Sequence, residues 1–211
     1  EHFLPGGESS ISPATQHLNV SRGLLFLFDP TQHARFREAC KANTKDPQIL
    51  GTGRSHRQDQ ILHEAANRIR THSGMSQQQK YSKPLIIVVT KMDAWGPTLW
   101  PEWANLDDPI RDAKQGIAGL ETGLIEDVSA KVRAILLKHA PEFINAAEGF
   151  GDKVTYIPSS ALGRSPEEDE AGMLGVRPNE VKPVWAEVPL LYLLNQTTTG
   201  LIPSVRRSTS G

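Results

Sequence analysis

The sequence predicts an α/β protein in which a mostly parallel sheet carries helices on both faces. Three apolar runs of strand length alternate with segments of helical periodicity, and this alternation is typical of parallel sheets. The runs are "LLFLF" at 24–28, "LIIVV" at 85–89 and "VTYI" at 154–157. The first two runs lack the apolar–polar alternation of half-exposed strands, which indicates strands buried on both faces.

The first strand is expected to be followed by a short helix, a loop and a longer helix. Pro30 ends the strand, and residues 31–40 can start the short helix. The polar residues 41–58 have the composition of a long surface loop. A helix is predicted at about 59–72, because apolar side chains fall on one face there. These side chains are Ile61, Leu62, Ala65, Ala66 and Ile69.

The second half of the chain is interrupted by two segments that do not have helical periodicity. Residues 94–118 contain three tryptophans and three prolines, too many prolines for one helix, so we expect an insertion or lid. Residues 163–183 are polar and acidic and predict another loop. A long helix is predicted at about 120–139, where apolar residues recur every four positions. A last apolar helix at about 184–195 contains Pro189, which should kink or restart it.

Length and composition limit the possible classes of protein. The 211 residues suffice for one substantial domain, which we expect over 1–203 with a flexible tail at 204–211. A net charge of −1 gives no electrostatic reason to bind nucleic acid or an anionic membrane. No apolar run approaches the roughly 18–20 residues that span a bilayer. The single cysteine, Cys40, cannot form an internal disulfide, which favours the cytoplasm.

The residues that follow the three strands are the candidates for a ligand site. Right-handed crossovers place the carboxyl end of every parallel strand on the same edge, where ligands of open α/β sheets bind. The segments at this edge are Asp29-Pro30-Thr31, Thr90-Lys91-Met92-Asp93 and Ser159-Ser160-Ala161-Leu162.

Two of these segments resemble the base-binding motifs of GTPases. Thr90-Lys91-Met92-Asp93 is similar to the guanine-recognition motif, usually written Asn/Thr-Lys-x-Asp. Ser160-Ala161-Leu162 is similar to the second base-contacting motif, which follows the next strand. Their order, the buried strand before each and the helix between them agree with that family. The resemblance covers about residues 1–200 and is closest to P-loop GTPases of the translation-factor-related (TRAFAC) class.

The resemblance implies a role for each motif residue. The Asp93 carboxylate would accept hydrogen bonds from the imino N–H and the amino group of guanine, a pair of donors that adenine does not present. Lys91 would lay its aliphatic stem along the base and reach the ribose side. Thr90 would tie its loop to neighbouring loops. In the turn from Ser160 through Ala161 to Leu162, a backbone N–H would meet the guanine carbonyl oxygen, and Ser160 would brace the turn.

The catalytic half of such a domain is not recognisable in the sequence. Nothing corresponds to Gly-x-x-x-x-Gly-Lys-Ser/Thr, the loop that binds phosphates; "GTGRSH" at 51–56 is the nearest glycine-rich piece. We therefore expect the C-terminal part of a GTPase-like domain, whose GTP or GDP and Mg²⁺ would also need residues outside this chain. The family's strand beside residues 24–28 would be missing, which leaves an open apolar edge. Alone, the chain is expected to be inactive, with His2 as a candidate catalytic residue that positions water.

Two other functions remain open at this stage. The chain could be a degenerate G-domain that acts as an interaction module. It could also be a fragment of a P-loop ATPase, because Asp29 ends an apolar strand as the Mg²⁺-binding aspartate of those enzymes does. As a purely structural alternative, Asp29 starts a turn or caps a helix.

Other side chains have a functional and a structural interpretation. The tryptophans of residues 94–118 could form a partner-binding lid, or could pack the insertion against the domain. His56, Asp59 and His63 could suggest a metal site, but polar surface fits their spacing better.

Overall fold

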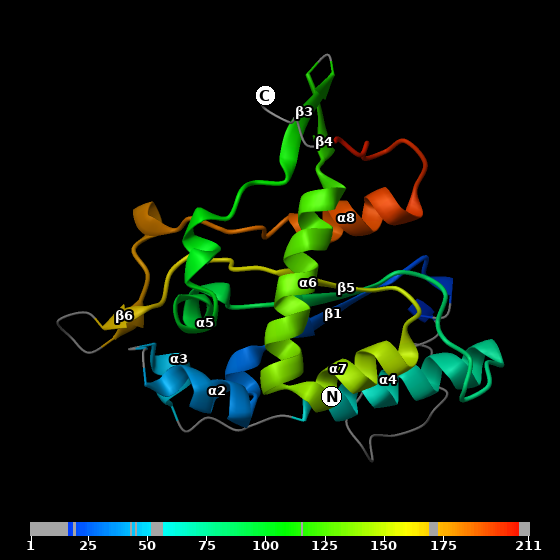
Figure 1. Ribbon diagram of the computed structural model, residues 1–211, viewed down its shortest axis with the longest axis horizontal. Coiled ribbons are helices and arrows are strands. Elements are labelled where there is room, and N and C mark those ends of the chain that lie inside the picture. The colour runs from blue at the N-terminus through cyan, green and yellow to red at the C-terminus, as the bar shows by residue number, and fades with distance from the viewer. Residues whose placement is uncertain are drawn as a thin grey trace.

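A three-stranded parallel sheet in the order β1-β2-β5 forms the centre of the protein (Figure 1). The computed structural model describes residues 17–18, 20–42, 44, 46–51, 57–114, 116–168 and 173–206. The strands are β1 (Leu24–Phe28), β2 (Leu85–Val89) and β5 (Val154–Pro158). Leu85 of β2 is in register with Leu24 on one side and Val154 on the other. The strands therefore end level at one edge, and the predicted α/β class and strand positions are confirmed.

Helices cover both faces of this sheet, and a further helix covers one of its edges. α4 (Gln58–Ser73) and α7 (Pro141–Phe150) lie on one face and α8 (Val188–Thr197) on the other (Figure 1). α6 (Thr122–His139) crosses β5 and packs against its outer edge (Figure 1). There the Ser129 hydroxyl accepts a hydrogen bond from the Tyr156 backbone N–H at 2.9 Å. A helix side chain thus supplies the hydrogen-bond partner that this backbone N–H of β5 does not find in a neighbouring strand.

The remaining elements lie outside the sheet. They are η1 (Pro30–Gln32), α2 (Ala34–Lys41), α3 (Pro47–Leu50), α5 (Met92–Leu99), η2 (Pro101–Asn105), β3 (Ile110–Lys114), β4 (Ile117–Leu120), β6 (Glu167–Glu168), β7 (Leu174–Gly175) and η3 (Pro178–Glu180). The antiparallel hairpin β3–β4 projects from the body of the protein (Figure 1). Among the described residues, no helix combines the length and apolar character that a membrane crossing needs.

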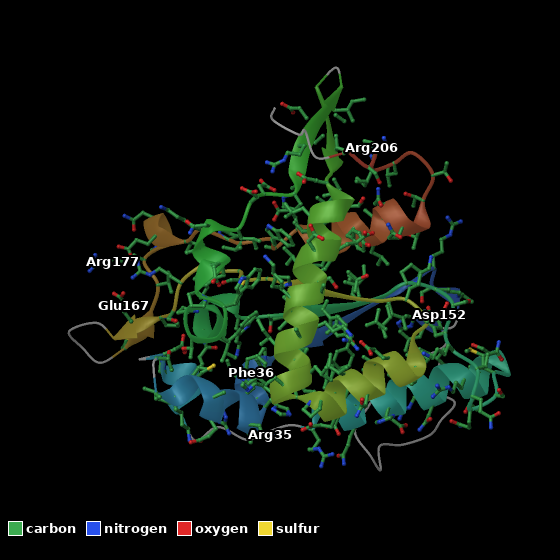
Figure 2. The ribbon with its side chains drawn as sticks, viewed as in Figure 1. Arg35, Phe36, Asp152, Glu167, Arg177 and Arg206 are labelled. Atoms are coloured by element: carbon green, nitrogen blue, oxygen red, sulfur yellow. The ribbon has the colours of Figure 1, made fainter. Side chains whose placement is uncertain are left out.

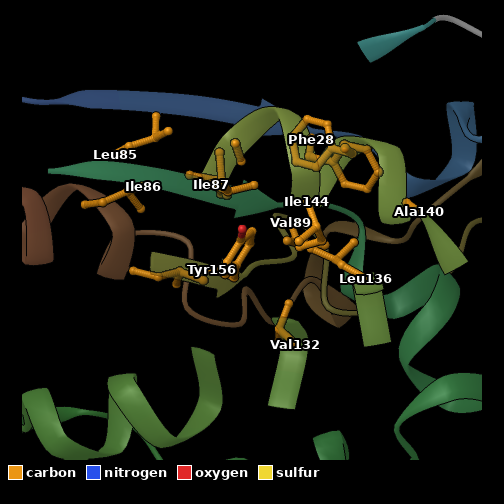
Figure 3. Close-up of a cluster of buried hydrophobic side chains, with 14 of the residues drawn as sticks. Phe28, Leu85, Ile86, Ile87, Val89, Val132, Leu136, Ala140, Ile144 and Tyr156 are labelled. Carbon is orange, nitrogen blue, oxygen red and sulfur yellow. The ribbon is translucent and has the colours of Figure 1, made fainter. Parts of the chain in front are cut away.

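The core forms around β2, whose five residues are all buried. Figure 3 shows side chains of β1 and β2 in one buried cluster with those of α6 and α7, among them Phe28, Ile87, Val132 and Ile144. Removing each such side chain from water stabilises the fold by about 1.5–3 kcal/mol. Because β2 has a strand on both sides and helices on both faces, its uninterrupted apolar run is explained.

The prediction that the first strand is buried on both faces is wrong. Leu25 and Leu27 of β1 are 40% and 67% exposed. β1 lies at the edge of the sheet, and no described strand pairs with its outer side. α8 covers the beginning of β1, where the Leu193 and Thr197 side chains approach Gly23. The composition of a strand therefore did not reveal that it lies at an edge.

The segment 94–118, for which we predicted an insertion or lid, begins with a helix that packs into the domain. Residues 94–99 continue helix α5, and Trp95 is fully buried while Trp100 is 7% exposed. Pro97 lies inside α5, which ends two residues later. Trp103 packs against Gly96, where a β-carbon would come within 2.9 Å of its ring. The tryptophans thus pack the segment against the domain, and β3–β4 is the part that projects.

Other boundaries also differ from the sequence-based predictions. The loop expected at 41–58 contains helix α3, whose Ile49 is fully buried. The last helix begins at Val188, because Pro189 fits the first turn, where its missing N–H leaves no bond unmade. Helix α7 was not predicted. Ser204, expected in a flexible tail, pairs with Leu120 of β4.

Candidate functional site

Backbone hydrogen bonds join the three loops at the carboxyl edge of the sheet. The Thr90 N–H and hydroxyl both donate to the Phe28 carbonyl oxygen, at 2.9 and 3.1 Å. The Met92 N–H donates to the Ser159 carbonyl oxygen at 3.1 Å. The segment after β2 is therefore tied to the end of β1 and to the residue that follows β5.

Asp93 and Ser160 meet in the interior of this edge. Asp93 is 6% and Ser160 1% exposed. The Ser160 hydroxyl donates to the Asp93 carboxylate and accepts from the Gly163 N–H at 2.8 Å. Ser160 also exchanges two backbone hydrogen bonds of 2.9 Å with Val184. The structure therefore brings the two predicted motifs together, and Ser160 braces its turn while it holds the carboxylate.

Two features of the chain fix the turn after Ser160. Gly163 has a φ of +71°, and a β-carbon there would lie 1.8 Å from the Lys182 carbonyl oxygen. Only glycine fits such a position. The Lys182 N–H donates to the Leu162 carbonyl oxygen at 3.0 Å. Leu162 is 37% exposed, and Ala161 is also exposed, so the turn presents its tip to solvent.

The Asp93 carboxylate lies in an environment that disfavours its charge. Burial raises the pKa of Asp93, and the nearby Asp46 carboxylate raises it further, while the Ser160 hydroxyl and Lys91 act in the opposite direction. Asp46 is 2% exposed. Its Oδ1 accepts from the Gln48 N–H at 2.7 Å and caps α3, but its Oδ2 has no hydrogen-bond partner within the described residues. Two buried carboxyl groups therefore lie near each other, and neither forms an ion pair with a described residue, which suits a ligand that brings hydrogen-bond donors.

Pro97 and Ser165 act together on the backbone beside Asp93. Because proline has no N–H, Pro97 cannot make the helical bond to the Asp93 carbonyl oxygen four residues earlier. The Ser165 hydroxyl approaches that oxygen at 3.5 Å, at the limit of a hydrogen bond. The acidic segment that follows is held by Arg164, which contacts Glu167 and Glu180. In Figure 2 Glu167 lies with this segment, beyond α5.

Lys91 points along the edge toward the end of β1. Its backbone is left-handed, with φ 54° and ψ 42°, and it forms the N-cap of α5. Its ammonium group lies 2.8 Å from Asp29 Oδ2 and donates to the Thr31 hydroxyl at 3.2 Å. A side chain other than glycine in this backbone region costs about 1–2 kcal/mol. The tertiary structure maintains this strained conformation at the residue between the two strand ends.

Two of the remaining predicted residues, His2 and His56, lie outside the described residues. Asp59 pairs with Arg57 at 2.7 Å. The described part of the chain holds no group of three or more His, Cys, Asp or Glu side chains that could bind a metal.

Sequence reasoning missed Asp46, Gln58 and Ser165 as residues of this region. The Gln58 side-chain amide pairs with both the N–H and the carbonyl oxygen of Asp29, at 2.8 Å each. The pair Asp46-Pro47 carries a helix-start signal, which predicts a cap but not its neighbourhood with Asp93. Nothing local distinguishes Gln58 or Ser165 from surface residues.

The chain was compared with family models, with curated proteins and with solved structures, and no match was found.

Proposed function

We propose that this chain contains the base-recognition part of a guanine-nucleotide-binding domain. The observation that carries the proposal is the hydrogen bond between Ser160 and Asp93, which joins two base-binding motifs at the carboxyl edge of a parallel sheet. Asp93 would accept from the N1–H and the amino group of guanine. Ser160 would hold the carboxylate in place, and a backbone N–H of the turn through Ala161 and Leu162 would meet the guanine carbonyl oxygen.

The electrostatics of the site support this assignment. A buried carboxylate that lacks a cationic partner gains most from neutral ligands with several N–H donors, because such ligands replace the lost water. Guanine presents three N–H bonds along one edge, whereas adenine presents an acceptor and an amino group. A site of this kind rejects a ligand that leaves the carboxylate unpaired.

The edge of the sheet is consistent with a larger domain. The Gln58 amide forms hydrogen bonds with the backbone N–H and carbonyl oxygen of Asp29, as a neighbouring strand would. The amide does not cover the exposed side chains of Leu25 and Leu27. A further strand beside β1 would cover this edge. The sequence has no phosphate-binding loop, so we propose nucleotide binding for this chain, and GTP hydrolysis with Mg²⁺ only for an assembly that includes one.

The alternative functions receive less support. In the ATPase hypothesis Asp29 would hold Mg²⁺, but its Oδ1 accepts from the Thr31 N–H and hydroxyl, and its Oδ2 pairs with Lys91. Asp29 thus caps η1, as the structural interpretation of this residue predicts. The interaction-module hypothesis differs from ours in one measurable property, the binding of guanine.

The test is a comparison of nucleosides, which need no phosphate-binding loop. Guanosine, inosine and adenosine are titrated into the ¹⁵N-labelled chain, and amide shifts are followed by NMR. Inosine lacks the amino group, and one hydrogen bond to a charged acceptor contributes about 1.5–3 kcal/mol. We expect guanosine to bind about 10- to 150-fold more tightly than inosine, with shifts at Asp93 and in the turn after Ser160. Equal binding of the three, or no binding, would refute the proposal and favour the interaction module.

A further inference from the structure

The Lys91 ammonium group is held by a small network at the end of β1. An ammonium group has three N–H donors. One is directed to Asp29 Oδ2 at 2.8 Å and one to the Thr31 hydroxyl at 3.2 Å. No third acceptor contacts it in the part of the chain that the structure describes. One donor therefore remains for a ligand.

Asp29 is itself fixed on every side, so this network is rigid. Its Oδ1 accepts from the Thr31 N–H at 2.9 Å and from the Thr31 hydroxyl at 2.6 Å. Its backbone N–H and carbonyl oxygen pair with the Gln58 amide. Asp29 is therefore a preorganised anion whose second oxygen is available to Lys91.

The ion pair changes what Lys91 can recognise. A free ammonium group beside a nucleotide site attracts phosphate, whereas one that is paired with a carboxylate at 2.8 Å has its charge largely cancelled. The side chains of Lys91 and Asp29 are 34% and 24% exposed, so the pair borders the solvent and a ligand can reach it. What remains for the ligand is one N–H donor and the aliphatic stem, which suit a ribose oxygen and a base.

We propose that Asp29 is a positioning residue that, with Thr31, fixes Lys91 and cancels its charge, so that this edge selects a nucleoside and does not attract phosphate. This inference rests on the proposed function. It assigns the ligand class of the described edge, a guanine nucleoside, and leaves phosphate binding to other residues.

The test compares guanosine with GMP in the wild-type chain and in Asp29→Asn. Asparagine keeps the oxygen that accepts from Thr31 and is an equally good cap, but it cannot neutralise Lys91. We expect the wild-type chain to bind the two ligands within about threefold of each other. In Asp29→Asn, GMP should gain about fivefold relative to guanosine at low salt, and this gain should disappear near 1 M salt.

Asp152→Asn is the matched control, because it removes the same charge at the opposite end of β5 (Figure 2). Its GMP-to-guanosine ratio should equal that of the wild-type chain. If Asp29→Asn also shows the GMP-to-guanosine ratio of the wild-type chain, the inference is overturned while the proposed function stands. If the wild-type chain binds neither ligand, the proposed function fails and the inference fails with it.

A second variant protects the test against misfolding of Asp29→Asn. In the double variant Asp29→Asn/Lys91→Met both charges are removed together, so no unpaired ammonium group disturbs the fold, and methionine keeps the aliphatic stem. If the two charges already cancel in the wild-type chain, this double variant weakens guanosine and GMP by the same factor. A selective loss of GMP binding would show that Lys91 attracts phosphate, and would overturn the inference.

Discussion

The substitution Asp93→Asn tests two properties separately: the affinity of the site for guanosine, and the stability that the buried negative charge costs the fold. The substitution exchanges one oxygen of a buried carboxylate for an amide group of nearly the same shape. The hydroxyl of Ser160, which now donates to the carboxylate, can donate to the asparagine oxygen. The variant should therefore keep its fold and lose the negative charge that burial and Asp46 disfavour.

The effect of this variant on binding follows from the donors of guanine. The amide presents one acceptor and one donor where the carboxylate presented two acceptors. At least one hydrogen bond to a charged acceptor is lost, which costs about 1.5–3 kcal/mol or about 10- to 150-fold in guanosine affinity. Xanthosine carries a carbonyl in place of the amino group, so it should bind Asp93→Asn better than it binds the wild-type chain. The nucleoside titration by NMR measures both changes.

The effect on stability has the opposite sign. Because the pKa of Asp93 is raised in the folded state, the folded protein binds this proton more tightly than the unfolded chain does. The ionised group therefore costs stability above its folded pKa, and this cost falls as the pH is lowered through that pKa. At pH 7 we expect Asp93→Asn to be about 1 kcal/mol more stable, with a melting temperature about 2–4 °C higher.

Thermal unfolding at pH 7 and pH 4 checks the sign of this effect. The advantage of Asp93→Asn over the wild-type chain should shrink at the lower pH, since the wild-type carboxyl group is then increasingly protonated. A variant that is less stable at pH 7 would contradict the electrostatic argument. A variant that keeps its full preference for guanosine would show that Asp93 is not the selector.

Three further substitutions test the surroundings of the site and an ion pair of helix α7. Gln58→Ala removes two hydrogen bonds to Asp29 and should cost about 1–3 kcal/mol in urea unfolding; an unchanged midpoint would contradict the strand-like role of the amide. Gly163→Ala places a β-carbon against the Lys182 carbonyl oxygen and should shift the amide signals of the turn and abolish the guanosine response. The hydrogen bonds from Arg133 lower the pKa of Glu148. The ionised Glu148 therefore stabilises the fold above about pH 4.3, and this stabilisation is lost as the pH falls through the folded pKa. Glu148→Gln should accordingly flatten the acid side of the stability–pH curve, and an unaltered acid side would contradict this.

Local patterns in the sequence determined the three strands of the sheet, the helices α4 and α6, and the positions of the motifs. The apolar run of β2 and the four-residue periodicity of α6 depend only on neighbouring residues, and both elements lie where they were predicted. The same locality places Asp93 and Ser160 directly after strands, so their convergence at one edge followed from the parallel topology. Local patterns left two interpretations of the tryptophans open, and tertiary packing decides for the core at Trp95.

Only the tertiary structure decided which side chains are partners. Gln58 is 29 residues from Asp29, and Lys91 is 60 residues from Thr31. Periodicity tells which face of an element is buried, but it carries no information about which distant residue faces it. The proximity of Asp46 to Asp93, the open edge of β1 and the ion pair that restrains Lys91 therefore follow from how the helices and loops pack around the sheet.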